Sequence, residues 1–279
     1  MMDKAEILRK AATLGVDPMF MEKDYALSWL LKGVYDENAL LAGALGELVF
    51  KGGTAIRKIY HPEWRLSEDL DFTFVGDASP NTSPSGYAIK EGLEDGFNKV
   101  FQGLREECGM DYRLNQLNVI GRGKVIDGRV QYEGPFKHRN TITIDISLDE
   151  KLELPPRQMP PHNDYPDLPS FKVSVYDERE IFAEKVRSII QRGKSRDYYD
   201  VWMLAKDGMR FDALTPLITK KCSAKGIQYA PELLLDETRF DEAKAYWEND
   251  LARLVSGKRL PDFDSVKQDL KRIIQEQTE

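Results

Sequence analysis

KGGTAIRKIYHPEWRLSEDLDFTF, residues 51–74, is the stretch that decides the fold expected for this chain. An apolar run leads into two adjacent glycines, Gly52 and Gly53, and a short helical segment is expected to follow them. The stretch ends in β-forming residues that contain Asp69 and Asp71. It therefore predicts a strand, a glycine turn, and then a second strand that carries two carboxylates.

The two carboxylates are expected on the same face of their strand. Side chains alternate between the faces of a strand, so Asp69, Asp71 and Thr73 point one way and the apolar residues between them point into the core. Like charges this close repel and raise each other's pKa unless a cation neutralises them. Mg²⁺ is the usual cation, because it binds one or two carboxylates together with substrate phosphates.

A third carboxylate follows the same logic. In TITIDIS, residues 141–147, the isoleucines share one face and Asp145 lies in the middle of the polar face. If this strand pairs beside the strand of Asp69 and Asp71, three carboxylates converge. Three carboxylates can hold two metal ions about 4 Å apart, which activate an attacking oxygen and stabilise a leaving phosphate.

The glycine pair then gains a purpose, because glycine lets the backbone approach a ligand closely. A helix that begins at about Thr54 would direct N–H groups and the positive end of its dipole at a phosphate, so Gly52, Gly53 and Thr54 are expected to bind it. The simpler alternative is that acidic residues on an exposed strand face are only solvated. An isolated DxD favours that alternative, and its combination with the glycine pair and the later strand favours metal binding.

A basic segment, KVRSIIQRGKSR at 185–196, contains five basic residues and no acidic one. On a helix, Lys185, Ser188 and Arg192 share a face, beside a buried apolar stripe. A cationic face suits triphosphate binding, since the charge that develops on the transferred group must be stabilised. The competing interpretation is a solvated helix face.

The segment RDYYD follows, at 196–200. Asp197 and Asp200 are three residues apart and can lie on one helical face. Two structural roles compete with a catalytic one: Asp197 as a helix N-cap or first-turn residue, and Asp200 as the partner of a nearby arginine. Spacing alone leaves these roles open.

The whole chain predicts a soluble α/β (α+β) protein in which a sheet-containing front half precedes a helical back half. Strands are expected at 45–50, 68–75, 111–120, 128–134, 139–148 and 171–176. Helices are expected at 3–14, 18–34, 90–108, 178–192, 196–206, 212–222, 239–256 and 262–276. A turn-rich loop at 76–88 and a proline-rich link at 154–169 are expected between them. We place a catalytic domain at 1–170 and a mainly helical domain at 171–279.

Composition excludes several classes of protein. The chain has 279 residues and a formal net charge of −7, which argues mildly against nonspecific coating of nucleic acid. Its two cysteines are far apart, so no CxxC metal site exists, and a reducing compartment is expected. No apolar run reaches about 18 residues and the start lacks an apolar signal region, so no membrane span and a cytoplasmic location are expected.

Taken in order, these motifs resemble the nucleotidyltransferase superfamily, whose hallmark is a GG or GS turn, a DxD or DxE strand and a third carboxylate on a neighbouring strand. More narrowly, they resemble the AbiEii family, the nucleotidyltransferase toxins of type IV toxin–antitoxin systems. The matching segments are EKDYALSWLL at 22–31, KGGTAIRKIY…RLSEDLDFTF, TIDIS, EKVRSIIQR and RDYYD. The resemblance covers roughly residues 20–207.

The resemblance implies a nucleotidyltransferase-like mixed sheet with flanking helices and a helical C-terminal domain that completes the active site. It implies Mg²⁺ or Mn²⁺ on Asp69, Asp71 and Asp145. Implied catalytic residues are Asp69, Asp71, Asp145, Lys185 and Asp200, with Asp200 preferred over Asp197 as the catalytic aspartate of RDYYD. Implied nucleotide-binding residues are Gly52, Gly53, Thr54, Arg65, Ser67, Lys185, Arg192, Arg196 and Asp197. Ser67 matches a family serine linked to self-modification, and hydrogen bonding in a turn is an equal alternative for it.

The activity implied is transfer of a nucleoside monophosphate from an NTP to RNA, with the 3′ end of tRNA as the expected acceptor. Blocked translation, a role in phage defence and a cognate antitoxin, commonly a winged-helix repressor, are also implied. A tRNA-binding protein usually has a basic surface, and 185–196 and 220–225 are the candidate segments here. Two alternatives stay open: nucleotidylation of a small molecule such as an aminoglycoside-type drug, and a catalytically inactive binding module.

Overall fold

The chain forms two compact units, which are described separately. The computed structural model describes residues 1–36, 46–76, 85–255 and 260–278. One unit contains Met1–Glu150 and Pro156–Tyr176, and the other contains Lys151–Pro155 and Asp177–Glu279. Most of the predicted loop 76–88, and residues 45 and 256 at the ends of predicted elements, lie outside the described residues. Within those residues, no helix has the length and apolar character needed to cross a membrane.

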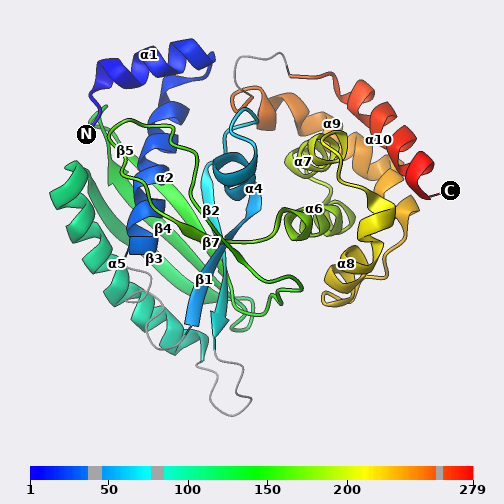
Figure 1. The fold of residues 1–279 in the computed structure, drawn as a ribbon, viewed down its shortest axis with the longest axis horizontal. Helices are drawn as coiled ribbons and strands as arrows, with labels where there is room; N and C mark the ends of the chain where they lie inside the picture. Colours follow the sequence, from blue (N-terminus) through cyan, green and yellow to red (C-terminus); the bar gives the residue numbers. More distant parts are fainter. Residues whose placement is uncertain (37–45, 77–84, 256–259, 279) are drawn as a thin grey trace. The chain divides into compact units, whose positions relative to one another are not determined.

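The first unit is built on a mixed sheet with the strand order β3-β4-β5-β2-β1-β7-β6 (Figure 1). Its strands are β1 (Gly46–Lys51), β2 (Asp69–Gly76), β3 (Asp111–Ile120), β4 (Val125–Glu133), β5 (Arg139–Ser147), β6 (Arg157–Met159) and β7 (Val173–Val175). β2 pairs in parallel with β5, and β1 with β7, whereas the other neighbours are antiparallel. The predicted mixed α/β fold is therefore confirmed, and the strands expected to carry the carboxylates are neighbours.

Helices cover one face of this sheet (Figure 1). They are α2 (Pro18–Asp36) and α5 (Gly86–Cys108), with α1 (Lys4–Leu14) packed against α2, and α4 (Gly52–Ala55) contains the glycine pair. Ile142, Ile144 and Ile146 of β5 are fully buried, as the alternation predicted. Ser85 is the N-cap of α5, and Gly109 caps its C-terminal end with a φ of 70°, a value that favours glycine. The residues between the isoleucines therefore lie on the other face of the sheet, which is polar.

Several element boundaries differ from those predicted, and one strand was not predicted. β4 begins at Val125 instead of 128, because a tight turn at 121–124 lets it pair with β3 along its full length. Asp127 and Gly128, which are weak strand formers, hid this start. The predicted proline-rich link contains the short edge strand β6, the place in a sheet where nearby prolines are tolerated. α5 begins at Gly86, four residues before its predicted start.

The second unit is helical, as predicted. Its helices are α6 (Glu178–Arg192), α7 (Ser195–Lys206), α8 (Phe211–Ser223), α9 (Glu237–Leu251) and α10 (Phe263–Thr278), with a short 3₁₀ turn, η3 (Pro231–Leu235). Aromatic rings form much of its core: the centroids of Tyr198 and Phe240 are 5.1 Å apart, and those of Trp247 and Phe263 are 5.0 Å apart. The functional domain boundary near residue 170 stays a prediction.

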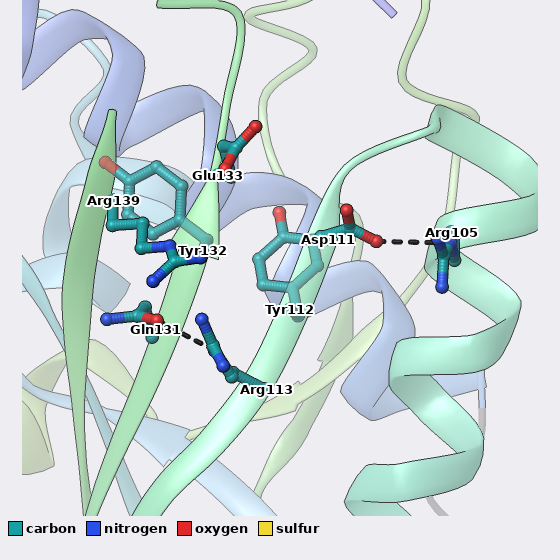
Figure 2. Close-up of a pocket in the computed structure, with 8 residues that line it drawn as sticks. All are labelled: Arg105, Asp111, Tyr112, Arg113, Gln131, Tyr132, Glu133 and Arg139. Atoms are coloured by element: carbon teal, nitrogen blue, oxygen red, sulfur yellow. Dashed lines mark hydrogen bonds and ion pairs between the residues drawn. The ribbon is translucent and has the colours of Figure 1, made fainter. Parts of the chain in front are cut away.

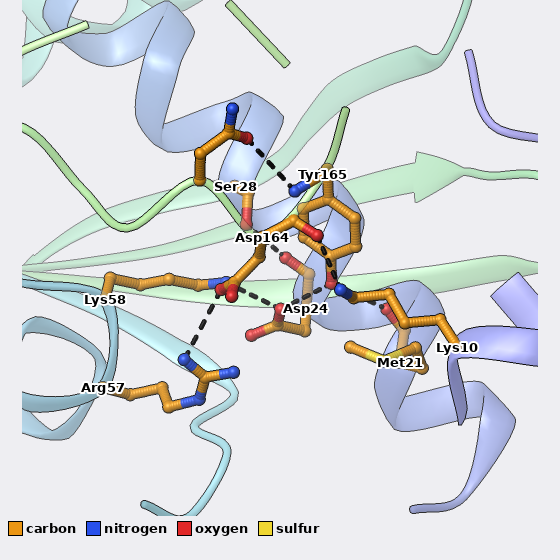
Figure 3. A network of polar contacts seen from close by, with 9 residues as sticks. Lys10, Met21, Asp24, Ser28, Arg57, Lys58, Asp164 and Tyr165 are labelled. Atoms are coloured by element: carbon orange, nitrogen blue, oxygen red, sulfur yellow. Dashed lines mark hydrogen bonds and ion pairs between the residues drawn. The ribbon is translucent and has the colours of Figure 1, made fainter. Parts of the chain in front are cut away.

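A buried charge network holds the segment that follows the glycine pair (Figure 3). Lys58 lies in η2 (Ile56–Tyr60), a π-helical turn, and its Nζ is 2.6 Å from Asp24 of α2 and 3.1 Å from Asp164. The Tyr165 hydroxyl donates to Asp24 at 2.6 Å. Burial would raise the pKa of Asp164, but Lys58 and Arg57 outweigh it and lower that pKa. The network ties η2 to α2 and so helps to position the glycine turn.

Candidate active site

Asp71 of β2 and Asp145 of β5 are opposite each other in the parallel β2–β5 register. Both side chains are partly buried, on the face away from the β5 isoleucines. Neighbouring strands are about 4.7–4.9 Å apart, so the two carboxylates are next to each other. This juxtaposition joins two segments that are distant in sequence, and it is the centre of the candidate site.

Asp69 is one step further along the same face, opposite Thr143. Two residues of a strand span about 6.6 Å, so Asp69 is farther from Asp145 than Asp71 is. Within the described ranges, no set of three or more acidic, histidine or cysteine side chains is arranged to hold a metal ion. The fit to Mg²⁺ therefore depends on the pair Asp71 and Asp145, because Mg²⁺ takes one or two carboxylates and completes its shell with water and phosphate oxygens.

The strands on either side of β2 and β5 add one residue each to this cross-strand row. Lys51 of β1 is opposite Asp71, and Asp127 of β4 is opposite Asp145. Lys51 is 8% exposed, and its Nζ donates to Ser147 Oγ at 3.2 Å. A lysine in this position adds positive charge beside the carboxylates. Neither Lys51 nor Asp127 was a predicted site residue, although Lys51 directly precedes the glycine pair and Asp127 follows the alternation of its strand.

Position 52 requires glycine, because its backbone lies directly against the Asp71 carboxylate. Its φ is +81°, and a Cβ at this position would be 2.1 Å from Asp71 Oδ2. A Cβ on Gly53 would be 2.7 Å from Arg65 Nη2 and 3.2 Å from Ser67 Oγ. Both glycines therefore allow the backbone to approach the polar side chains of the site closely.

Thr54 ties this turn to the carboxylate strand, because its Oγ1 donates to the backbone oxygen of Asp69. The helix begins at Gly52, two residues earlier than predicted, and α4 is only four residues long before the chain continues as η2. So short a helix has a weak dipole, and the phosphate-binding role of Gly52, Gly53 and Thr54 stays a prediction.

Arg65 and Ser67 lie between the glycine turn and β2. Arg65 is 4% exposed, and its Nη1 donates to the Leu66 carbonyl at 3.1 Å. β2 begins at Asp69, so Ser67 precedes the strand and does not share its face with Asp69. The approach of its hydroxyl to Gly53 still places it in the candidate site.

The other predicted residues form a cluster inside the second unit. Lys185 Nζ is 2.8 Å from Asp200 Oδ2 and 3.3 Å from Asp197 Oδ1. Arg192 donates to Asp197 through Nε at 2.9 Å and Nη2 at 3.2 Å. α6 ends at Gly193, whose φ of 55° reverses the chain so that α7 starts at Ser195. The tight turn brings the basic end of α6 against the acidic first turns of α7.

Asp197 is a first-turn residue of α7, where a negative charge favours the helix dipole, and Lys194 occupies the N-cap. Burial would raise the pKa of Asp197, but Lys185 and Arg192 outweigh it and lower that pKa. Asp197 therefore stays ionised and orients both cations. Arg196 is partly exposed in the same turn. Asp200 pairs with a lysine, where an arginine was the structural alternative.

The predicted site residues thus fall into two groups, one in each unit. The first unit contains Gly52, Gly53, Thr54, Arg65, Ser67, Asp69, Asp71 and Asp145, and the second contains Lys185, Arg192, Arg196, Asp197 and Asp200. The first group offers carboxylates beside a glycine turn, which suits a metal–phosphate complex. The second offers oriented cations, which suit an anionic group. Their catalytic and binding roles stay predictions.

Comparison with known proteins supports the resemblance seen in the motifs. The family model described as "Nucleotidyl transferase AbiEii toxin, Type IV TA system" matches residues 38–269. The fold is similar to that of MenT4, a nucleotidyltransferase toxin from Mycobacterium tuberculosis H37Rv, with a TM-score of 0.63, 19% identity, and coverage of 100% of this chain and 90% of that chain. No curated protein matches the chain. The chain therefore belongs to the AbiEii family of type IV toxin–antitoxin systems and is a nucleotidyltransferase.

Proposed function

We propose that this enzyme transfers a nucleoside monophosphate from an NTP to an RNA acceptor in a metal-dependent reaction, with the 3′ end of tRNA as the preferred acceptor. The observation that carries the proposal is the pairing of Asp71 with Asp145 on adjacent strands, against the backbone of Gly52. Two close carboxylates need a cation, and a glycine turn beside them leaves room for phosphate.

Asp71 and Asp145, with Asp69 beside them, would hold Mg²⁺ or Mn²⁺ together with the triphosphate. The bound metal would supply positive charge for the reacting phosphate and make the acceptor hydroxyl more acidic. Asp145 accepts the proton of that hydroxyl, whose oxygen attacks the α-phosphorus. The bond between the α-phosphorus and the bridging oxygen breaks, and pyrophosphate leaves with the electron pair.

Lys185 is proposed to neutralise the triphosphate, and Arg192 and Arg196 to assist it. Support comes from the geometry of Lys185, whose ammonium group is held by Asp197 and Asp200 at fixed distances. A cation that its neighbours already orient needs no reorganisation when charge develops on phosphate. Asp200 is the proposed catalytic aspartate of this cluster, and Asp197 is proposed to orient the cations.

The biological role that we propose is that of a toxin which blocks translation, within a phage-defence system, in the cytoplasm. Membership of a type IV toxin–antitoxin family supports a cognate antitoxin, for which we propose a winged-helix repressor. Nucleotidylation of a small molecule remains the second candidate, because the formal net charge of −7 does not indicate a broad basic surface.

The decisive experiment is transfer of label from each α-³²P-NTP to total tRNA in the presence of Mg²⁺. We expect one NTP to label tRNA, and Asp71→Asn to lower the rate about 10²–10³-fold or more, the size of effect seen when one electrostatic group of a transition state is removed. Asp95→Asn is the matched control, because Asp95 is an exposed carboxylate on α5 of the same unit. Equal rates for the wild type and Asp71→Asn would overturn the assignment.

The alternatives give different results in the same experiment. Pyrophosphate release that needs a small acceptor, with no label on RNA, would support the small-molecule enzyme. An inactive binding module would release no pyrophosphate with any acceptor. A Mg²⁺-dependent thermal shift with an NTP that disappears in Asp71→Asn would support the nucleotide site independently of the acceptor.

A further inference from the structure

A pocket of about 280 Å³ lies at one end of the sheet, lined by three arginines from separate elements and by Tyr112 and Tyr132 of the buried sheet face (Figure 2). Arg105 comes from the last turn of α5, Arg113 from β3 and Arg139 from the start of β5. The side chains of Arg113 and Arg139 are exposed. Neither the predicted basic segments nor the candidate active site includes these arginines.

The strand register connects this pocket to the candidate active site. Arg139 starts β5, and every second residue after it lies on the same polar face until Asp145 is reached. Arg113 lies on the same face, because Gln131 of β4 is opposite both Arg113 of β3 and Thr141 of β5. Six residues of strand span about 20 Å, so the pocket lies about 20 Å along the sheet from Asp145.

A further arginine lies between the pocket and the carboxylates. Arg129 of β4 is exposed and opposite Thr143, which in turn is opposite Asp69. Arg139, Arg113 and Arg129 therefore occupy three successive rows of the sheet, and the row of Asp145 and Asp71 comes next. We call Arg139, Arg113 and Arg129 the arginine track.

The chemistry of the track suits phosphate. Arginine presents a planar set of donors that matches phosphate oxygens, and arginines placed at intervals can bind successive phosphates of a chain. Arg113 is oriented, because its Nε donates to Gln131 Oε1 at 2.8 Å. Two carboxylates line the same pocket: Asp111 pairs with Arg105 in an exposed, weak ion pair, and Glu133 is opposite Arg139 across β4 and β5. With three arginines in the lining, the pocket keeps an excess of one positive charge.

We propose that the arginine track binds the phosphate backbone of the RNA acceptor, so that the RNA strand crosses the polar faces of β3, β4 and β5 and its reacting end lies at Asp71 and Asp145. This inference rests on the proposed function. A backbone of repeating negative charges fits three arginines in successive rows better than a single small anion does. The path also explains how an acidic chain can bind RNA, because the positive charge is concentrated on a line that leads to the reacting groups.

The test uses the double variant Arg113→Gln/Arg139→Gln in the full chain. Its matched control is Arg9→Gln/Lys99→Gln, which removes two exposed cations from α1 and α5 of the same unit. Binding of fluorescent tRNA is measured by anisotropy over a range of salt concentrations. Loss of two phosphate contacts should reduce the slope of log K against log salt by about 1.4, since each contact on a single strand contributes about 0.7. The control double variant should keep the wild-type slope.

Kinetics provide a second readout. We expect the KM for tRNA to rise about tenfold in Arg113→Gln/Arg139→Gln with kcat retained, and the KM for the NTP to stay unchanged. A dinucleotide acceptor bound at Asp71 and Asp145 is too short to reach Arg113 or Arg139, so the double variant should transfer to it at the wild-type rate. In the opposite direction, Thr141→Arg adds a second cation to the row of Arg113 and should increase both tRNA affinity and the salt slope.

The outcomes separate this inference from the proposed function. If the wild type labels tRNA and the double variant binds tRNA with unchanged affinity and salt slope, the arginine track does not bind the RNA backbone. The proposed function then stands. If the wild type neither binds nor labels RNA, both fall. If the dinucleotide reaction is impaired as strongly as the tRNA reaction, the arginines act on the active site itself, and the track is again wrong.

Discussion

Two lysine–aspartate networks in this chain have the same chemistry and different access to solvent. In the first unit, Lys58 is bound by Asp24 and Asp164 and is 2% exposed; we call this the closed network. In the second unit, Lys185 is bound by Asp197 and Asp200 and is 12% exposed; with Arg192, whose side chain is 54% exposed, it forms the open network. Ion-pair distances are similar in the two networks, so distance does not indicate which network acts on a substrate.

Exposure to solvent is therefore the better guide to function. A buried pair such as Lys58 and Asp24 has already lost its water, and a ligand could reach it only by opening the fold. The open network includes a cation that extends into solvent and can take up an anion while Asp197 holds its other side. The closed network should therefore govern stability, and the open network should govern activity.

The largest effect on stability is expected for Lys58→Met. The variant leaves Asp24 buried without its closest cation, so the free energy of unfolding should fall by about 3–5 kcal/mol. Urea denaturation measures it. Lys10→Met is the control: Lys10 donates to the Asp164 backbone carbonyl and lies 5.0 Å from the centroid of the Tyr165 ring, contacts whose loss should cost about 1–2 kcal/mol. Equal losses for the two variants would contradict a structural role for the closed network.

Lys185→Met should have the opposite result to Lys58→Met, with a small loss of stability and a large loss of activity. Asp197 keeps Arg192 as a donor, whereas the buried carboxylate of Asp200 loses the ammonium group 2.8 Å away, so the free energy of unfolding should fall by about 1–3 kcal/mol. Transfer of the nucleoside monophosphate should fall about 10²–10³-fold, because an oriented cation at the phosphate is lost. Denaturation and label transfer on the same preparation give both values. A variant that loses stability and activity in proportion would place Lys185 with the closed network.

The pH dependence of the free energy of unfolding should show how much the ionised Asp197 stabilises the fold. Its folded-state pKa is lowered, so its ionisation stabilises the fold at pH values above the unfolded pKa of about 3.9, and this stabilisation is lost as pH falls through the folded pKa. Urea denaturation at pH 6, 4 and 3 should therefore show a steeper acid loss for the wild type than for Asp197→Asn. Asp164→Asn tests the closed network in the same way, because the pKa of Asp164 is also lowered. Parallel pH curves for the wild type and both variants would argue against this linkage.

The smallest effect on stability is expected for Arg192→Gln. The side chain of Arg192 is more than half exposed, and the cost should stay below about 1 kcal/mol, as for other exposed ion pairs. If Arg192 assists triphosphate binding, the KM for the NTP should rise while denaturation midpoints hardly change. A large loss of stability with an unchanged KM would show that Arg192 is a structural residue.

Much of the fold was predictable because its signals are local. Alternation in TITIDIS predicted a strand with a buried isoleucine face, and β5 has that face. The helical back half followed from the apolar periodicity of 178–276. The start of β4 and the strand β6 were missed, because both depend on pairing with a neighbouring strand and the intrinsic preferences of their residues are weak.

The candidate site was predictable in its residues and not in its arrangement. The motifs named Asp71 and Asp145, and the structure makes them opposite each other. Sequence patterns did not indicate Lys51, Asp127 or the arginine track. Each of these residues is ordinary within its own segment, and its position in the site depends on pairing with the neighbouring strand. Lys58 was visible within the opening stretch, yet nothing in its spacing indicated that Asp24 and Asp164 would enclose it.

By itself, the sequence determined which face of each strand is polar, where glycine is placed, and which family the chain resembles. These properties depend on neighbours within a few residues, through the two-residue period of a strand and the backbone freedom of glycine. The strand order, and the register that brings Asp71 to Asp145 and aligns the arginine track with them, arise from tertiary packing. Register depends on burying the apolar faces of all the strands against α2 and α5 at once, and no single segment contains that information.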